Sequence, residues 1–262
     1  MSYETIDLTV RDGVAHVTLN RPEAANSINV ELARDLMYAA LACDEDQSVR
    51  AVVLAGAGRM FCGGGDLKTF AGKGAGLPHY LKEVTTYLHA AASRLTRMNA
   101  PVIAAVHGSA AGAGMSLACA ADIVLAAEGA KFTMAYTRAG LTPDGSSTYF
   151  LSRIVGLRRA LELTLTNRVL SAVEAVALGI ATRVVPEAEL LDEAQALAAE
   201  FAAGPTQAYG AAKRLLHAGW TGTLETQMEL ETRTIADVAR GGDAREGIAA
   251  FVEKRPPKFS GH

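Results

Sequence analysis

Residues 101–126, PVIAAVHGSAAGAGMSLACAADIVLA, contain the pattern that best predicts the fold. PVIAAV (101–106) is a short apolar run typical of a buried strand, and DIVLAA (122–127) predicts a second strand. Between them, GSAAGAGMSLA (108–118) consists largely of glycine and alanine. Small residues permit a tight turn and let the following helix pack closely on a sheet. Strand, glycine turn, helix and strand in this order predict an α/β fold.

Residues 100–121 carry no formal charge, so a membrane-spanning helix is an alternative for this segment. A helix that crosses a bilayer needs about 20 consecutive, predominantly apolar residues. This segment instead contains Pro101, His107 and three glycines, and small side chains dominate it. We therefore expect a buried strand that leads into a helix, and no membrane association.

Strand and helix patterns alternate in the chain before this segment. ETIDLTV (4–10) and VAHVTLN (14–20) flank the turn RDG (11–13), which is a β-hairpin signal. Further apolar patterns predict helices at 29–46 and 79–98 and a buried strand at 49–56. The glycine-rich loop AGKGAGLP (71–78) is predicted to be the most mobile element.

The chain after residue 127 becomes mostly helical. KFTMA (131–135) and ATRVV (181–185) predict short strands, and from about residue 144 the remaining pattern is helical. Gly or Pro separates the predicted helices, which are 157–166, 171–178, 187–203, 206–218, 223–239 and 243–254. We expect an α/β core over residues 1–200 and a C-terminal helical region over residues 201–262.

Composition restricts the class of protein and its partners. Half of the 262 residues are apolar, a fifth are charged and the net charge is −3, as in an ordinary globular protein. This charge provides no strong positive field for nucleic acid or an anionic membrane. Cys43, Cys62 and Cys119 lack metal-ligand spacing and are expected to be free thiols in a reducing cytoplasm. The N-terminus lacks the apolar core of a secretory signal, so we expect a cytoplasmic location.

Two glycine-rich loops, GRMFCGGGDL (58–67) and GSAAGAGMSLA (108–118), each follow a predicted strand. Such turns can point backbone N–H groups into a pocket, and two N–H groups that converge on one carbonyl oxygen form an oxyanion hole. Close packing of a helix on a sheet is the alternative explanation for either loop. Neither loop has the glycine spacing of a dinucleotide or P-loop phosphate site.

Four motifs in order along the chain resemble the crotonase superfamily, also called the enoyl-CoA hydratase/isomerase family. They are LNRPEAANSI (19–28), FCGGGDL (61–67), residues 101–126 and EGIAAFVEKRPPKF (246–259). The resemblance implies a spiral ββα core with a C-terminal helical trimerisation region, assembled as a homotrimer or a dimer of trimers. It also implies an acyl-coenzyme A thioester as ligand, no metal, and no cofactor apart from the coenzyme A of the substrate.

The same resemblance assigns the two backbone donors of the oxyanion hole to Gly65 and Ala113. Hydratases of this family use two glutamates, whose positions are occupied here by Ser116 and Tyr136. Hydration needs groups that activate water and deliver a proton, and a serine without an activator is a poor base. The departure from the family pattern therefore argues against an efficient hydratase.

Asp144, in the segment GLTPDGSSTYFLSRIVG (140–156), is the candidate for the missing carboxylate. Local sequence favours another role, since Asp at this place is a good N-cap for the helix that follows. However, residues 130–145 resemble ring-1,2-epoxyphenylacetyl-CoA isomerases, where the matching aspartate shuttles a proton. Residues 148–170 and 213–220 also resemble 4-chlorobenzoyl-CoA dehalogenases, where it attacks the aromatic ring.

We expect an isomerase that shifts a 3-enoyl-CoA double bond to the 2-enoyl position, with Asp144 as the base. Desolvation among apolar groups raises the pKa of a carboxylate and makes it a better base. A dehalogenase is the alternative, because His89 stands where dehalogenases have a histidine. His89 can also be explained as an ordinary helix residue. However, the tryptophan donor and the oxyanion phenylalanine of that branch are replaced here by Tyr136 and Gly65.

The remaining expected roles concern binding. Asp66 is expected to fix the loop that presents the Gly65 N–H, and Lys68 either meets coenzyme A phosphates or faces solvent. His217 and Trp220 are expected to be structural. The expected substrate or coenzyme A contacts are Ala24, Ala25, Gly63, Gly64, Asp66, Leu67, His89, Gly112, Ser116, Tyr136, Phe251 and Lys254. A non-enzymatic acyl-CoA-binding or RNA-binding scaffold is a further alternative, although the chain lacks a basic stripe for RNA.

Overall fold

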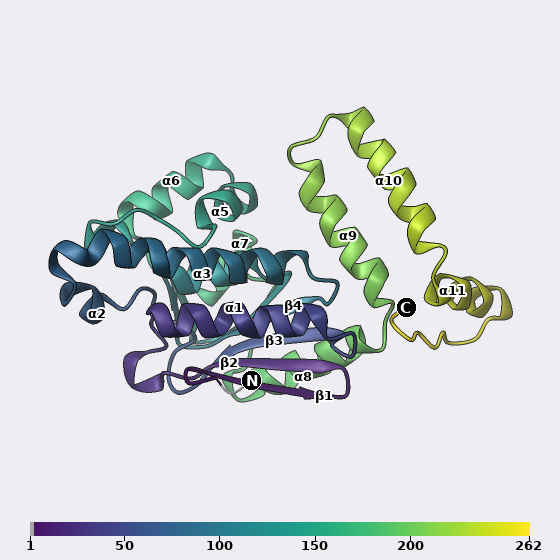
Figure 1. The fold of residues 1–262 in the computed structure, drawn as a ribbon, viewed down its shortest axis with the longest axis horizontal. Coiled ribbons are helices and arrows are strands. Elements are labelled where there is room, and N and C mark those ends of the chain that lie inside the picture. The colour runs from purple at the N-terminus through teal and green to yellow at the C-terminus, as the bar shows by residue number, and fades with distance from the viewer. Residues whose placement is uncertain (1–2) are drawn as a thin grey trace.

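The computed structural model describes residues 3–262 and is built around a six-stranded sheet (Figure 1). Its strands follow one another across the sheet as β1 (Ile6–Arg11), β2 (Val14–Leu19), β3 (Ala51–Gly56), β4 (Val102–Val106), β6 (Ile123–Ala127) and β9 (Arg183–Val185). β1 and β2 pair antiparallel, and every later neighbour pairs parallel. The predicted α/β class is confirmed.

The hairpin between β1 and β2 has the predicted turn. Asp12 and Gly13 both have positive φ, 51° and 78°, which is the backbone conformation of a type I′ turn. Asp tolerates this conformation and Gly adopts it freely. The strands pair from Ile6 with Leu19 to Arg11 with Val14, so the turn sets the register of β1, the edge strand, on β2.

A second, three-stranded sheet was not predicted. It consists of β5 (Ser109–Ala111), β7 (Lys131–Thr133) and β8 (Leu170–Ser171). β5 falls inside the segment that the sequence predicts as a glycine turn. A strand of three small residues is too short to show the alternating apolar pattern of a strand. Pairing with β7 holds β5 in place. This small sheet therefore orients the glycine-rich segment that follows it.

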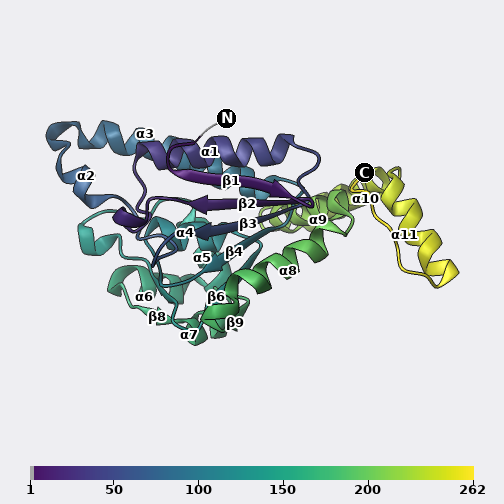
Figure 2. The same cartoon turned by 90° about the horizontal axis from the view of Figure 1, so that it is seen from below.

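Helices cover both faces of the large sheet. α1 (Val30–Glu45) and α3 (Leu77–Arg97) lie side by side over one face, and α8 (Leu190–Ala202) packs on the other (Figure 2). α4 (Ala113–Ala120) starts directly after the glycine turn and is buried along its whole length. α1 and α3 correspond to the helices predicted at 29–46 and 79–98, which are confirmed.

The prediction of a loop at 71–78 is wrong over most of that range. α2 (Leu67–Ala71) leads into a 3₁₀ turn (Gly74–Gly76), and α3 begins at Leu77 rather than at residue 79. Pro78 lies in the first turn of α3, where its missing N–H needs no acceptor and its fixed φ suits a helix. The proline therefore begins a helix here instead of marking a loop.

The C-terminal half is helical, as predicted. Besides α8, its α-helices are α5 (Ser147–Val155), α6 (Leu157–Thr166), α7 (Ala172–Ala177), α9 (Thr206–Gly219), α10 (Leu224–Val238) and α11 (Gly242–Glu253). α9, α10 and α11 extend away from the two sheets (Figure 1). The largely buried Lys213 of α9 forms an ion pair of 2.6 Å with Asp122, next to β6. The division at residues 200 and 201 falls inside α8 and stays a prediction.

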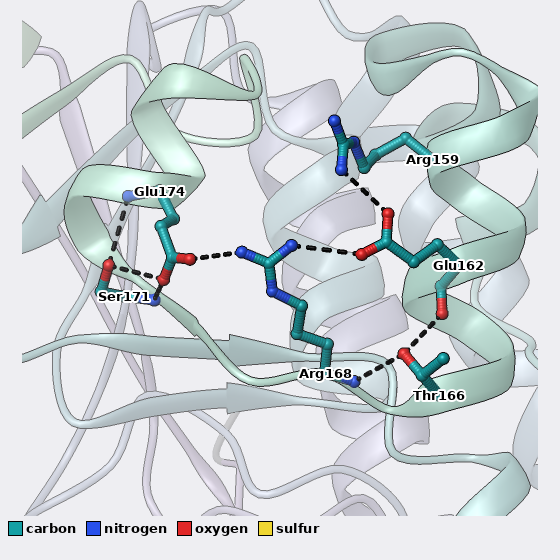
Figure 3. A network of polar contacts seen from close by, with 6 residues as sticks. All are labelled: Arg159, Glu162, Thr166, Arg168, Ser171 and Glu174. Carbon is teal, nitrogen blue, oxygen red and sulfur yellow. Dashed lines mark hydrogen bonds and ion pairs between the residues drawn. The ribbon is translucent and has the colours of Figure 1, made fainter.

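A polar network fixes the connection from α6 through β8 to α7 (Figure 3). Arg168 forms ion pairs with Glu162 and Glu174, and Ser171 and Glu174 form a capping box at the start of α7. These side chains are substantially exposed, so each ion pair contributes little to stability. Their effect is local: they fix the segment that contains β8, which pairs with β7.

Within residues 3–262, no helix combines the length and the apolar character needed to cross a membrane.

Candidate active site

The two glycine-rich loops run parallel and start from one bridge. Cys62 and Ala110 pair as an isolated parallel bridge, with hydrogen bonds of 3.0 Å from Cys62 N–H to Ser109 O and from Ala111 N–H to Cys62 O. Three residues further along each loop are Gly65 and Ala113. In the described part of the chain, neither of these two N–H groups has a protein acceptor. The arrangement supplies the two free donors that an oxyanion hole needs.

Glycine is required where the loops meet. Gly112 has φ +51° and ψ −119°, and Gly64 has φ +98°; residues other than glycine rarely adopt these backbone conformations. At Gly114, a Cβ atom would lie 2.4 Å from the carbonyl oxygen of Cys62. Glycine at this position therefore lets the start of α4 approach the first loop closely enough to bring the two donors together.

Asp66 holds the first loop in place, in line with its predicted role. Its carboxylate accepts the Thr69 N–H at 3.0 Å, which caps α2, and it pairs with Arg21 at 3.1 Å. Burial raises the pKa of Asp66, but these hydrogen bonds and the positive charge outweigh burial and hold the pKa below its usual value. An ionised, fully engaged carboxylate of this kind is a poor candidate for proton transfer.

Two supporting residues, Arg21 and Asn26, were not predicted from the sequence. The buried Asn26 amide donates to the carbonyl oxygens of Ala57 and Met60, and its own oxygen accepts the Arg21 N–H. Both residues lie in the motif LNRPEAANSI, which is the signal that could have identified them. They tie this N-terminal motif to the loop that presents Gly65.

A cavity of about 250 Å³ opens beside the two donors. Most of its wall is apolar, from α2, α3 and the segment after β7. Among the described residues that line it, Asp144 is the only one with a carboxyl group. The predicted site residues that line it are Gly63, Gly64, Gly65, Leu67, Gly112, Ala113, Tyr136 and Asp144.

Parts of the apolar wall were also not predicted from the sequence. Leu88 belongs to the apolar stripe of α3, so the sequence predicts it only as a core residue. Phe70 and Leu141 gave no signal, since each reaches the cavity from an irregular or very short segment. No local pattern distinguishes such wall residues from ordinary core residues.

Asp144 lies in a network of hydroxyl groups. The Tyr136 hydroxyl donates to Asp144 Oδ1 at 2.6 Å, and Ser116 Oγ lies 2.8 Å from Tyr136 Oη. The alternative role of Asp144 as a helix cap is wrong. Ser146 occupies the N-cap position of α5, and the Asp144 carboxyl group accepts none of the N–H groups of that helix.

Two opposing influences act on the proton affinity of this network. Burial raises the pKa of Asp144 above its ordinary value, although the Tyr136 hydrogen bond and the nearby His89 partly oppose the rise. Burial, followed by the negative charge of Asp144, raises the pKa of Tyr136. Tyr136 therefore remains a neutral donor, and Asp144 is a stronger base than an exposed aspartate.

His89 does not line the cavity beside the two donors. It is exposed on α3, and its Nε2 accepts the Gly145 N–H at 3.1 Å. It lines a second cavity of about 820 Å³, which lies between α3, α5 and α9 and also borders Asp144. The structure therefore places His89 away from the cavity beside the Gly65 and Ala113 donors and in contact with the Asp144 loop, and its expected substrate contact stays a prediction.

Other predicted residues lie near the cavity or away from it. The Ala25 carbonyl accepts the Gly63 N–H at 2.8 Å, so Ala24 and Ala25 border the first loop without lining the cavity. Ser116 is fully buried beneath Tyr136. Lys68 is exposed on α2. Phe251 and Lys254 are exposed at the end of α11 and do not line the cavity, and their expected contact with coenzyme A stays a prediction.

His217 and Trp220 pack edge to face with ring centroids 5.0 Å apart, which agrees with a structural role. Phe150 contacts both rings, at 5.7 Å and 6.3 Å between centroids. This cluster joins α9 to α5. It lies on the side of Asp144 that faces the second cavity, where Phe150 and His217 are lining residues.

Comparison with known proteins identifies the family. The model of the enoyl-CoA hydratase/isomerase family matches residues 9–262. A protein named probable enoyl-CoA hydratase from Rhodobacter capsulatus is 42% identical over 100% of both chains. The 1,2-epoxyphenylacetyl-CoA isomerase of Escherichia coli is 41% identical over 96% of this chain and 97% of its own.

A more distant relative and a solved structure agree with this assignment. The 4-chlorobenzoyl coenzyme A dehalogenase-2 of an Arthrobacter species is 34% identical over 93% of this chain and 88% of its own. The crystal structure of an enoyl-CoA hydratase/isomerase from Cupriavidus metallidurans superimposes with a TM-score of 0.91, at 33% identity over 100% of this chain and 98% of that one. The chain therefore belongs to the enoyl-CoA hydratase/isomerase family and has the crotonase fold.

Proposed function

We propose that this protein is an acyl-CoA isomerase that moves a double bond from the 3-enoyl to the 2-enoyl position. The observation that carries the proposal is the single carboxyl group, Asp144, among the described residues of the cavity wall. Hydroxyl groups, from Ser116 and Tyr136, occupy the two positions where hydratases of the family have glutamates. One carboxylate is sufficient for a proton shift between two carbons.

The reaction would use Asp144 twice. Its carboxylate removes a proton from C2 of the 3-enoyl thioester, and the electrons move into a dienolate. The thioester oxygen, now negative, accepts hydrogen bonds from the Gly65 and Ala113 N–H groups, which stabilise the charge. The protonated Asp144 then returns the proton at C4, and the double bond forms between C2 and C3. No atom enters or leaves the substrate.

Hydration is less well supported by the site, although several relatives carry the name hydratase. Adding water requires one group to activate the water and another to protonate C2. Ser116 and Tyr136 hydrogen-bond to each other and cannot serve as an ionised base at neutral pH. The site would therefore lack one of the two charged groups that hydration uses.

Dehalogenation is also less well supported. Asp144 would attack the ring, and a base would then be needed to activate water for release of the product. His89 Nε2 already accepts the Gly145 N–H, so that nitrogen has no lone pair left for water. The tryptophan and the phenylalanine expected of a dehalogenase are replaced by Tyr136 and Gly65.

A ring epoxide is the second candidate substrate, because of the 41% identity to the 1,2-epoxyphenylacetyl-CoA isomerase. Asp144 and the two backbone donors would perform the same tasks of proton transfer and enolate stabilisation on this substrate. The cavity wall is mostly apolar and suits either a short alkenyl group or a single ring. The two candidates therefore differ in the acyl group and share the catalytic residues.

We also propose a homotrimer or a dimer of trimers. Large apolar side chains are exposed on the C-terminal helices, a feature of surfaces that bind another protein. They include Leu224, Ile235, Ile248, Phe251 and Val252. In such an assembly, Phe251 and Lys254 could contact the coenzyme A of a neighbouring subunit.

The wild-type protein should convert a 3-enoyl-CoA to its conjugated 2-enoyl isomer. The expected measurement is a rise in the absorbance of the conjugated thioester, with no consumption of water. In a parallel assay that starts from 2-enoyl-CoA, hydration would remove this absorbance. That loss should be much slower, since the protein lacks the two glutamates that hydratases use. Faster hydration than isomerisation would contradict the proposal, and chloride release from 4-chlorobenzoyl-CoA would support the dehalogenase instead.

The pH dependence of isomerisation should show an acid limb that belongs to Asp144. The base form is ionised, so kcat/KM should fall as the pH falls through the pKa of this group. Burial raises that pKa, so the limb should lie at higher pH than the pKa of an ordinary aspartate, about 3.9. A profile that stays flat down to that value would show that Asp144 is not the base.

A further inference from the structure

We propose that Tyr136 and Ser116 are positioning residues that hold the Asp144 carboxyl group for proton transfer, rather than contacts for the substrate. This inference rests on the proposed function, because it assigns Asp144 the role of base. It goes beyond that function by giving a task to the two hydroxyl groups at the positions of the family's glutamates. The three residues come from different parts of the chain and meet only in the folded protein.

The direction of the hydrogen bonds follows from the chemistry of the groups. An ionised carboxylate can only accept, so the Tyr136 O–H donates to Asp144 Oδ1 across 2.6 Å. The phenol has a single hydrogen, so its oxygen can only accept from Ser116 Oγ at 2.8 Å, and the same serine hydroxyl lies 3.0 Å from the Asp144 carbonyl oxygen, to which it can also donate. Ser116 therefore supports Asp144 in two ways, through the Tyr136 hydroxyl and directly at the Asp144 carbonyl oxygen.

These hydrogen bonds leave one carboxylate oxygen for the substrate. In the described part of the protein no side chain or backbone group donates to Asp144 Oδ2, whereas Oδ1 is occupied by Tyr136. A base must be held within about 0.5 Å of a productive position, and hydrogen bonds from fixed neighbours provide such restraint. Tyr136 itself is buried, with 8% of its surface exposed, so its ring cannot easily rotate away.

The main chain of Asp144 is restrained from both sides. Its carbonyl oxygen lies 3.0 Å from Ser116 Oγ and accepts from Ser147 Oγ at 2.9 Å. The next residue, Gly145, donates its N–H to His89. Gly145 has φ +58°, and a Cβ there would lie 2.8 Å from the Ser116 Cβ, so the loop rests directly on α4. Fixed backbone and fixed Oδ1 together determine where Oδ2 points.

Tyr136 also adjusts the proton affinity of the base. Its hydrogen bond favours the ionised carboxylate and so lowers the pKa of Asp144, which burial raises. Other charged or titratable groups that share a cavity with Asp144 are Lys82 on one side and His89, Arg97, Tyr149, Arg214 and His217 on the other. Removal of the Tyr136 hydroxyl leaves all of these in place, so its effect can be separated from theirs.

The test compares Tyr136→Phe, Ser116→Ala and the double variant with the wild type. Phenylalanine keeps the ring that forms the cavity wall and removes only the hydroxyl group. We expect Tyr136→Phe to lower kcat by roughly 10- to 100-fold, as misplacement of a catalytic group does, with KM nearly unchanged. The acid limb of kcat/KM should move to higher pH. Tyr38→Phe, at an exposed position on α1, is the matched control and should match the wild type.

Ser116→Ala should have a smaller effect in the same direction, because Ser116 contacts Tyr136 and the Asp144 carbonyl oxygen but not the carboxyl group. The double variant should be only slightly slower than Tyr136→Phe alone, with a loss smaller than the two single losses combined, since the serine has lost one of the two groups through which it acts. Additive losses would overturn the proposed coupling of Ser116 to Tyr136. A rise in KM with unchanged kcat in Tyr136→Phe would also overturn it, and would show that Tyr136 binds substrate.

A measurement without substrate separates this inference from the proposed function. The Asp144 carboxyl carbon can be followed by ¹³C NMR in protein labelled at aspartate, with Asp144→Asn to assign the signal. Its titration should move to higher pH in Tyr136→Phe, and an unchanged titration would contradict the inference. If wild type does not isomerise 3-enoyl-CoA, the proposed function fails, but this titration still tests whether Tyr136 acts on Asp144.

Discussion

Asp144→Asn should lower kcat for the isomerisation of 3-enoyl-CoA by about 10³- to 10⁴-fold, at the upper end of the usual contribution of a positioned base. Asparagine has nearly the same shape as aspartate, and its amide oxygen can still accept the Tyr136 O–H. It cannot accept a proton from C2, so only the enzyme's backbone donors would remain to assist the reaction. KM should change little, because the cavity wall and the two N–H donors stay in place.

The stability of the same variant provides a control. Burial raises the pKa of Asp144, which means that the ionised carboxylate is less stable in the folded protein than in the unfolded chain. Above that pKa the ionised group therefore reduces the free energy of unfolding, and a neutral asparagine removes this penalty. Asp144→Asn should unfold at the same temperature as wild type or higher, so lost activity could not be attributed to misfolding.

A matched control and a contradicting outcome complete this test. Asp192→Asn, at an exposed position in the first turn of α8, should leave activity unchanged and lower the free energy of unfolding by no more than about 1 kcal/mol, through the lost interaction with the helix dipole. If Asp144→Asn retained more than about a tenth of wild-type kcat, a loss far below that of a removed base, another group would have to transfer the proton. The pH profile of that residual activity would then identify the group.

The fold could be predicted from the sequence where elements are long and patterned. The hairpin, the helices α1 and α3, and α6 lie within a few residues of their predicted positions, because apolar spacing and turn chemistry are local properties. β5 and β8 could not be predicted, since three and two residues show no period. Their existence depends on pairing with β7, which is distant in the sequence.

The site could be predicted only in part. The resemblance to a family indicated Gly65, Ala113 and Asp144, whereas local sequence alone favoured a helix cap for Asp144. The contact between Ser116 and Tyr136 spans two elements, and nothing in either segment indicates the other. The resemblance to dehalogenases indicated His89 as a site residue, but His89 lines the second cavity rather than the first. Such contacts depend on how elements pack.

Gly114 is the position where the oxyanion hole can be tested without changing either donor. A Cβ atom there would lie 2.4 Å from the Cys62 carbonyl oxygen and 2.8 Å from the Cys62 Cβ. The nearest atom belongs to the backbone, so a side-chain rotation cannot relieve the contact. The start of α4, which presents the Ala113 N–H, must therefore move away from the loop that presents Gly65.

Gly114→Ala should consequently lower kcat by about 10²-fold, close to the effect of removing one donor from an oxyanion hole. The free energy of unfolding should fall by about 1 to 3 kcal/mol, as overpacking of a core does. Gly76→Ala is the matched control, because a Cβ at Gly76 meets no atom within 4 Å and its φ is −81°. Both effects should be absent there. If Gly114→Ala lost stability but kept full kcat, the enolate would not depend on the spacing of the two loops, and the assignment of Gly65 and Ala113 as paired donors would be wrong.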